Sequence, residues 1–166
     1  MTSVIVVPHR HLVFMAKSLD TTDVLSAGRV IVGTGAGWMR ASSRGSTCPT
    51  STLGGVTDEY VAIMKKLWTQ QWAAHHGEFF RFADVAAGPK PLQQPHPPIW
   101  VGGESMAALR RTVALADGWY PLGTNPKFRM DRLDAYAARR DKLFALADHA
   151  GRDPRQHCFS QQLRVP

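Results

Sequence analysis

The sequence predicts an α/β protein in which helices cover a parallel sheet. Three observations support this prediction: β-branched runs typical of buried strands, amphipathic stretches between them, and glycine or proline where one element changes into the next. The order is β-α-β-α, then a loop, then β-α-β-α-β. About five strands are too few to close a (β/α)8 barrel, which takes roughly 250 residues. The pattern alone therefore leaves two alternatives, an open doubly wound sheet and part of a barrel.

The amino-terminal half predicts a β-α-β unit followed by a second helix. The β-branched run Thr2–Val7 predicts a strand that Pro8 ends, and Val30–Val32 predicts the next strand. Between them, Leu12–Leu25 has apolar residues at helical spacing. The second helix is predicted over Asp58–Trp72, where one face carries Tyr60, Ile63, Met64, Leu67 and Trp68.

The carboxyl-terminal half predicts a loose hairpin, a proline-rich loop and further alternation of strands and helices. Gly151 is expected to close the last helix. In order, the expected elements are a hairpin in Gly77–Val85, a loop over Ala86–Pro98, a strand at Ile99–Val101, a helix over Met106–Leu115, a strand at Asp117–Pro121, a helix from Asn125 to about Ala150, and a strand within Gln156–Val165.

The stretch Pro98–Ser105 is the strongest candidate for a ligand site. An apolar strand ends on Gly102 and Gly103, and a helix follows at once with Ser105 as its candidate N-cap. Glycines let a ligand approach the backbone, and the first N–H groups of a helix attract anions. The stretch predicts a phosphate-bearing ligand at the carboxyl end of a parallel strand. The alternative is a plain strand–helix turn.

Other motifs give weaker signals. The run Gly33–Gly37 departs from the dinucleotide fingerprint G-x-G-x-x-G because residue 38 is Trp, although its glycines still allow a ligand to come close. His75 and His76, followed by Glu78, lack helical metal spacing and are expected to be solvated loop histidines. Arg10 is expected to have a structural role, with a ligand phosphate as the alternative partner.

Charge and composition narrow the function further. The 166 residues carry a formal charge of +7, but Lys and Arg are scattered, which disfavours nucleic acid and suits an anionic cofactor. No apolar run approaches the ~20 residues of a membrane span. The first residues do not form a secretory signal, so a cytoplasmic protein is expected. Cys48 and Cys158 give no metal-type spacing and no disulfide framework.

Several stretches together resemble the luciferase-like monooxygenase family of flavin- or F420-dependent oxidoreductases. The most specific are Gly88–Pro91, the run Pro-Pro-Ile-Trp-Val-Gly-Gly that ends at Gly103, and Asp117–Trp119. The family resemblance implies a (β/α)8 barrel. Residues 1–166 would form a single partial domain with family strands 3 to about 7.

The resemblance also implies a cofactor, either FMN or F420, bound at the carboxyl ends of the strands. Ser3 and Val4 match a strand that often carries a bulge or a non-proline cis peptide under the ring system. The residues matching cofactor-contacting segments are Ser3, Val4, Gly33, Thr34, Gly35, Val101, Gly102, Gly103 and Ser105.

The implied chemistry is hydride transfer or oxygen activation on a small organic substrate. No residue is assigned a catalytic role. A homodimer is compatible with the resemblance, whereas a nucleic-acid or membrane partner is not expected.

The chain departs from the family pattern at its start. It begins at the family's third strand, so the first two β/α units, roughly 70 residues, are missing. The expectation is a truncated product or a start codon assigned too late. An inactive remnant, or a non-catalytic cofactor-binding or interaction module, is the alternative to an enzyme.

A second departure lies in residues 42–55, where Ser42–Thr52 has no helical period. The family usually has an acidic segment of the type Glu-Phe-x-x-Leu-x-Val-Pro here. Suitable codons for such a segment, read one base later, yield Ser42–Thr52. We therefore hypothesise two compensating frameshifts, with an ordinary divergent Ser/Thr-rich loop as the alternative.

The nucleotide sequence of the gene tests the frameshift hypothesis. Translating the codons of residues 42–52 in the shifted frame is expected to give an acidic, apolar segment of the family type. Codons that give no such segment in that frame would end the hypothesis.

Overall fold

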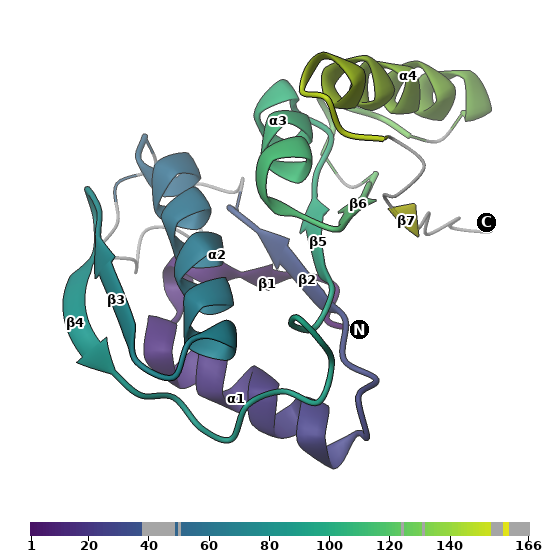
Figure 1. Cartoon of the computed structure of the whole chain (residues 1–166). Helices are drawn as coiled ribbons and strands as arrows, with labels where there is room; N and C mark the ends of the chain where they lie inside the picture. The colour runs from purple at the N-terminus through teal and green to yellow at the C-terminus, as the bar shows by residue number, and fades with distance from the viewer. Residues whose placement is uncertain (38–48, 50, 124, 131, 154–157, 160–166) are drawn as a thin grey trace. The chain divides into compact units, whose positions relative to one another are not determined.

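The computed structural model describes residues 1–37, 49, 51–123, 125–130, 132–153 and 158–159, in two compact units, Met1–Pro98 and Ile99–Pro166 (Figure 1). The first unit contains β1 (Ile5–Val6), a 3-10 helix (Val7–His9), α1 (Leu12–Leu25), β2 (Val32–Gly35), α2 (Leu53–Thr69), β3 (Ala73–His76) and β4 (Arg81–Val85). The second contains β5 (Ile99–Gly102), α3 (Met106–Leu115), β6 (Gly118–Tyr120), α4 (Leu133–His149) and β7 (Cys158–Phe159).

Most of the segment for which frameshifts are hypothesised lies outside the described residues. Residues 42–48 and 50 are not described, and residues 53–55 form the first turn of α2. The prediction of one partial-barrel domain over residues 1–166 stays a prediction.

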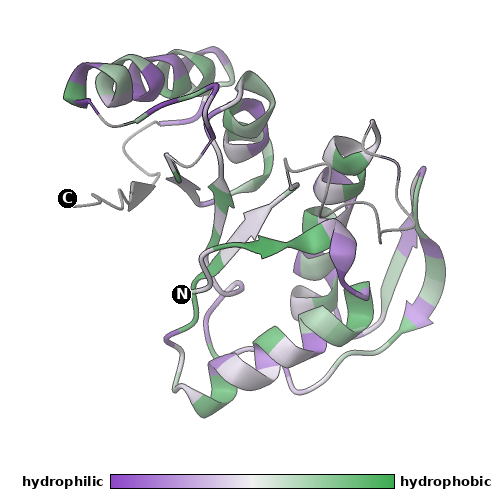
Figure 2. Cartoon of the chain, turned by 180° about the vertical axis from the view of Figure 1, so that it is seen from behind, coloured by the Kyte–Doolittle hydropathy of each residue, from purple (hydrophilic) through white to green (hydrophobic). Residues whose placement is uncertain are grey.

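The first unit confirms the predicted parallel β-α-β arrangement. β1 pairs with β2 in parallel, with Ile5 opposite Thr34 and Val6 opposite Gly35, and α1 connects them. β1 is hydrophobic along its length, whereas β2 is largely pale in Figure 2. Both strands differ from their predicted bounds. β1 starts later than predicted, at Ile5, and β2 runs on to Gly35 because β1 supplies partners there.

α1 has the bounds that its apolar spacing predicted, Leu12–Leu25. The buried Asp23 side chain joins the end of α1 to the proline-rich loop. Its carboxylate accepts hydrogen bonds from the Val30 amide (3.3 Å), the Gln93 amide (3.1 Å) and the Gln93 side chain (2.7 Å). Burial alone would raise the pKa of Asp23, but these donors outweigh burial and the pKa is lowered. The loop is therefore anchored to α1 by an ionised carboxylate.

α2 is longer at its start and shorter at its end than predicted. It begins at Leu53 and ends at Thr69. Its first turn therefore contains Gly54 and Gly55, although glycine is a weak helix former. The predicted apolar face is confirmed, since its five members are all buried. The indole N–H of Trp68 donates to the Ala16 carbonyl (3.1 Å) and ties α2 to α1.

β3 and β4 form a hairpin that starts before the predicted range Gly77–Val85, because Ala73–His76 form its first strand. A single α2 carboxylate holds the hairpin in place. Glu59 accepts from the Phe79 amide (2.9 Å), the Phe80 amide (3.0 Å) and His75 Nε2 (2.7 Å). The expectation that His75 is a solvated loop histidine is therefore wrong. It lies in β3 with an 11% exposed side chain, because a buried partner on α2 is reached only after folding.

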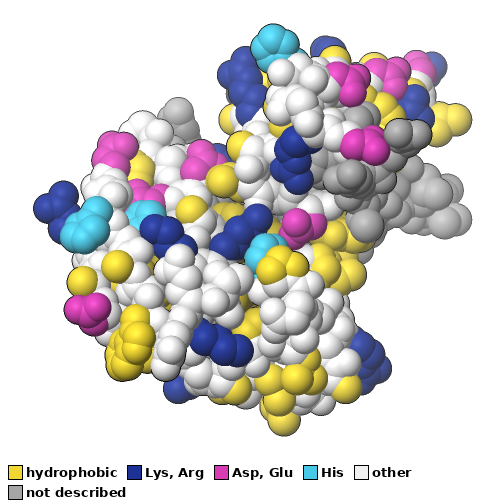
Figure 3. Space-filling view, in the orientation of Figure 1, with side chains coloured by type: hydrophobic (Ala, Val, Ile, Leu, Met, Phe, Trp, Pro, Cys, Tyr) yellow, Lys and Arg dark blue, Asp and Glu magenta, His cyan; other side chains and the backbone are white. Residues whose placement is uncertain are grey.

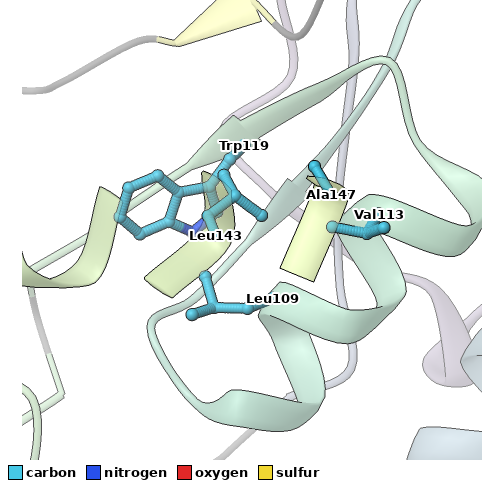
Figure 4. Packing of buried hydrophobic residues seen from close by; sticks show 5 residues of the cluster. All are labelled: Leu109, Val113, Trp119, Leu143 and Ala147. Carbon is cyan, nitrogen blue, oxygen red and sulfur yellow. The ribbon is translucent and has the colours of Figure 1, made fainter. Parts of the chain in front are cut away.

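The second unit is a parallel β5–β6–β7 sheet with α3 and α4. β5 pairs with β6, and β6 pairs with β7. The core between the two helices and the sheet consists of Leu109, Val113, Trp119, Leu143 and Ala147 (Figure 4). The bounds of α3 are those predicted. Of the range predicted for the last strand, only Cys158–Phe159 lie within the described residues, and they form β7.

α4 begins at Leu133, not at Asn125 as predicted, and it ends near the predicted position. The Asn125 side chain accepts from the Lys127 amide (3.0 Å) and its carbonyl accepts from the Phe128 amide (2.9 Å). Asn therefore forms a local turn in place of a helix start. Gly151 closes the helix with a positive φ of 68°, as predicted.

The surface is mixed in charge. On the face shown in Figure 3, Lys and Arg side chains are scattered among acidic, histidine and apolar ones. Within the described residues, no helix combines the length and apolar character that a membrane span requires.

Replacing Glu59 with Gln is expected to lower the free energy of unfolding by roughly 1–3 kcal/mol. The neutral amide accepts more weakly, and its NH2 group would face a backbone N–H. Urea unfolding at pH 7 measures the change. Asp134→Asn is the matched control, because the Arg132–Asp134 pair is 75% and 70% exposed, and it should leave stability unchanged.

The same carboxylate predicts a pH dependence. Burial alone raises the pKa of Glu59, but the two amides and His75 together lower it below its ordinary value of 4.5. A lowered pKa stabilises the fold above the ordinary value, and this contribution is lost as the pH falls through the folded-state pKa. Wild-type stability should therefore decrease more steeply on acidification below about pH 4.5 than that of Glu59→Gln. Parallel slopes would contradict the assignment.

Candidate functional site

The pairing of β1 with β2 brings together the five predicted site residues of the first unit, with two of them directly before β1 and three within β2. These are Ser3, Val4, Gly33, Thr34 and Gly35. The Ser3–Val4 peptide is cis, as the family resemblance implied for this position. Beside it, Thr2 Oγ1 donates to the Gly33 carbonyl (3.0 Å) and accepts from the Gly33 amide (2.8 Å). The irregular peptide is therefore held directly against β2.

The glycines of β2 serve the close approach of the first strand. A Cβ on Gly33 would collide with the backbone carbonyl oxygen of Thr2, and a Cβ on Gly35 would lie 3.0 Å from Val4 Cγ2. Thr34, between them, is fully buried. The missing side chains of these glycines therefore make room for the neighbouring strand. The prediction that they also make room for a ligand stays a prediction.

The turn after β5 is built around Gly102 and Gly103. The Gly103 amide donates to the Tyr120 carbonyl (3.2 Å), and its carbonyl accepts from the Trp119 indole (2.8 Å). Its φ of +110° lies where L side chains are rarely found. Val101 is 1% exposed and packs against α3, so only its backbone can face a ligand.

The start of α3 confirms the N-cap prediction. Ser105 Oγ accepts from the Ala108 amide (3.1 Å), and the Leu109 amide donates to the Ser105 carbonyl (3.0 Å). Helix geometry leaves the amides of Met106 and Ala107 without an intrahelical acceptor. The positive end of the helix dipole adds to the pull of these N–H groups on an anion. The turn therefore fits a phosphate group.

Glu104, between the glycines and the N-cap, is a residue that the sequence interpretation missed. It is 2% exposed, and its Oε1 accepts from the Leu122 amide (2.6 Å) and the Gly123 amide (2.7 Å). A carboxylate next to a glycine pair gives no periodic signal, and its partners come 18 and 19 residues later. Only the fold shows that this carboxylate accepts hydrogen bonds from two backbone amides.

The remaining candidate groups have structural surroundings. The Arg10 backbone carbonyl accepts from the Tyr60 hydroxyl (3.1 Å), and burial raises the pKa of Tyr60. The role of the Arg10 side chain stays a prediction. The Nε2 atom of His9 and one carboxylate oxygen of Asp20 are buried without a hydrogen-bond partner in the described part of the chain. The described residues contain no group of three or more His, Cys, Asp or Glu that could hold a metal.

The comparison with known families identifies the origin of this arrangement. The family described as luciferase-like monooxygenase matches residues 1–165. The chain belongs to this family. The predicted resemblance is therefore confirmed.

Individual luciferase-like proteins agree with this result. The FMNH(2)-dependent dimethylsulfone monooxygenase of Pseudomonas putida is 34% identical over 129 residues, which are 74% of this chain and 36% of that protein. A monooxygenase from Streptomyces bottropensis superposes with a TM-score of 0.79 at 22% identity, covering 96% of this chain and 47% of that one. An F420-dependent secondary alcohol dehydrogenase, solved with an F420-acetone adduct, gives a TM-score of 0.71 at 19% identity, covering 91% and 44%.

These comparisons decide between the two fold alternatives. The matched structures are luciferase-like (β/α)8 barrels, so the predicted incomplete barrel is confirmed and the open doubly wound sheet is excluded. The chain spans less than half the length of these relatives.

Replacing Gly33 with Ala is expected to destabilise the first unit by at least about 2 kcal/mol, because the new methyl group would overlap the Thr2 carbonyl oxygen. Thermal unfolding followed by circular dichroism measures the effect. Gly88→Ala is the matched control, since a Cβ at Gly88 meets nothing within 4 Å. Equal melting temperatures for the two variants would show that β1 and β2 do not approach as closely as described.

Proposed function

We propose that this chain binds a phosphate-bearing flavin or deazaflavin, FMN or F420, and works as a luciferase-like oxidoreductase on a small organic substrate. The observation that best supports the proposal is the turn after β5. There, Gly102 and Gly103 lack side chains beside the amides of Met106 and Ala107, which have no intrahelical acceptor. Two backbone donors at a helix start suit a phosphate group.

The residues proposed to contact the cofactor are those that match the family's segments. Ser3, Val4 and the run Gly33–Gly35 would contact the ring system. Val101, Gly102 and Gly103 would contact the phosphate side through their backbone, because the Val101 side chain is in the core. Ser105 Oγ already accepts from the Ala108 amide, and its hydroxyl hydrogen remains able to donate to a phosphate oxygen.

The cofactor would supply the redox chemistry, either hydride transfer or oxygen activation. One relative is named as FMNH(2)-dependent and one structural neighbour as F420-dependent, so both cofactors stay in the proposal. The contribution of the chain's own residues would be to bind and orient the cofactor. No described side chain is assigned a proton-transfer role. A homodimer and a cytoplasmic location stay predictions.

Binding and turnover are separate proposals, because the chain spans 36% of the dimethylsulfone monooxygenase. A non-catalytic cofactor-binding chain would bind FMN or F420 and leave the reduced cofactor unchanged. An enzyme would accelerate its oxidation when substrate is present. Single-turnover absorbance measurements distinguish the two.

Replacing Met106 with Pro is expected to weaken the binding of FMN or F420 while the chain stays folded. Met106 is the first residue of α3, where proline is tolerated, and Ser105 before it is already extended with a ψ of 156°. The change removes one proposed phosphate donor. Loss of one charge-assisted hydrogen bond should weaken FMN binding roughly tenfold. Riboflavin, which lacks the phosphate, should bind equally to both proteins.

Fluorescence titration of the whole chain with FMN, riboflavin and F420 measures these affinities. The matched control is Leu133→Pro, which places proline at the first residue of α4 and should change none of them. A wild-type chain that binds FMN no better than riboflavin, and does not bind F420, would contradict the proposal. So would equal FMN affinities for wild type and Met106→Pro.

A further inference from the structure

The Glu104 carboxylate links two strand ends of the second unit. Its Oε1 accepts from two consecutive amides, those of Leu122 (2.6 Å) and Gly123 (2.7 Å), which follow β6. Glu104 itself follows the glycine turn at the end of β5. Hydrogen bonds of backbone N–H groups to a carboxylate are short and strong, and two on one oxygen fix its position. With 2% of the residue exposed, little solvent competes for this contact.

Glu104 lies close in sequence to the first amides of α3, which are the proposed donors to the phosphate. Glu104 comes directly before the N-cap Ser105, where a side chain of its length could fold back onto the first amides of α3. It points instead to the end of β6, where Leu122 and Gly123 supply the donors. The amides of Met106 and Ala107 therefore stay open to an external anion.

Two more hydrogen bonds join the same strand ends. Trp119 Nε1 donates to the Gly103 carbonyl (2.8 Å), and the Gly103 amide donates to the Tyr120 carbonyl (3.2 Å). These bonds fix the glycine that precedes Glu104. Glu104 then extends the connection beyond the last residue of β6 to Gly123, whose φ of +65° marks a turn. The Glu104 contact is thus what joins the segment after β6 to the glycine turn.

We propose that Glu104 is a positioning residue for the phosphate end of the cofactor. Its buried carboxylate holds the segment after β6 against the Gly102–Gly103 turn and leaves the first amides of α3 to the ligand. The inference rests on the proposed function. The Glu104 side chain would contact no ligand atom. It would act by positioning the backbone amides that bind the phosphate.

The test compares Glu104→Ala with Glu104→Gln in the full chain. Both variants lack the negative charge, but only Gln keeps an oxygen that can accept from Leu122 and Gly123. The two variants therefore differ in the presence of the side chain and its acceptor while their charge is the same. The ratio of the riboflavin and FMN dissociation constants should be roughly tenfold smaller in Glu104→Ala than in Glu104→Gln. Riboflavin should bind both variants equally.

A second readout does not need the cofactor. Hydrogen exchange followed by NMR should show faster exchange of the Leu122 and Gly123 amides in Glu104→Ala than in Glu104→Gln. Circular dichroism checks that each variant is folded. If Glu104→Ala does not fold, Glu104→Gln against wild type still decides. The neutral oxygen accepts more weakly than a carboxylate, so the Leu122 and Gly123 amides should exchange somewhat faster, and unchanged exchange of both amides would contradict the contact.

The outcomes separate the inference from the function. A wild-type chain that prefers FMN to riboflavin, with the same preference in both variants, would overturn the role of Glu104 and leave cofactor binding intact. Equal loss of preference in both variants would assign the effect to charge and would also overturn it. A wild-type chain that binds neither FMN nor F420 would overturn the proposed function and this inference together.

Discussion

Buried and half-buried carboxylates that accept backbone N–H groups join segments of this protein that are distant in the sequence. Asp23 accepts from the Val30 and Gln93 amides, and Glu59 accepts from the two amides of the β3–β4 turn. In the second unit, Asp117 accepts from the Ile99 amide (2.8 Å), and Glu104 accepts from two amides after β6. Amides outside the sheet ladders have no partner strand, so an acidic side chain supplies the acceptor, from a helix for Asp23 and Glu59 and from a turn for Glu104 and Asp117.

This arrangement explains how such short strands can form a stable sheet. β1 has two residues and β6 has three, so their ladders alone contribute few hydrogen bonds. Carboxylate contacts fix the segments on either side of the strands, and the apolar faces of the helices bury the sheet. The segments that flank the strands are thereby held by the scaffold. A cofactor that binds mainly through backbone groups needs such a scaffold.

Glycine has two different roles at the strand ends. In β2, the missing Cβ atom of Gly33 allows the Thr2 backbone to approach, so this glycine is explained by packing within the first unit. After β5, Gly103 is required by its positive φ, and a Cβ there would make only an ordinary contact with Ala108 at 3.6 Å. The sequence makes these glycines look alike. Their neighbours decide that the first closes a gap between strands and the second shapes a turn.

The sequence by itself determined the alternation of strands and helices, the bounds of α1 and α3, the N-cap at Ser105 and the family. These features depend on residues close together in the chain, through apolar spacing, glycine and proline punctuation, and short motifs. The tertiary structure alone decided where β2 ends and which partners the carboxylates bind. His75 meets Glu59 across 16 residues, and Glu104 meets Gly123 across 19. Partners so distant leave no periodic trace in the sequence, because their contact exists only once the elements between them have packed.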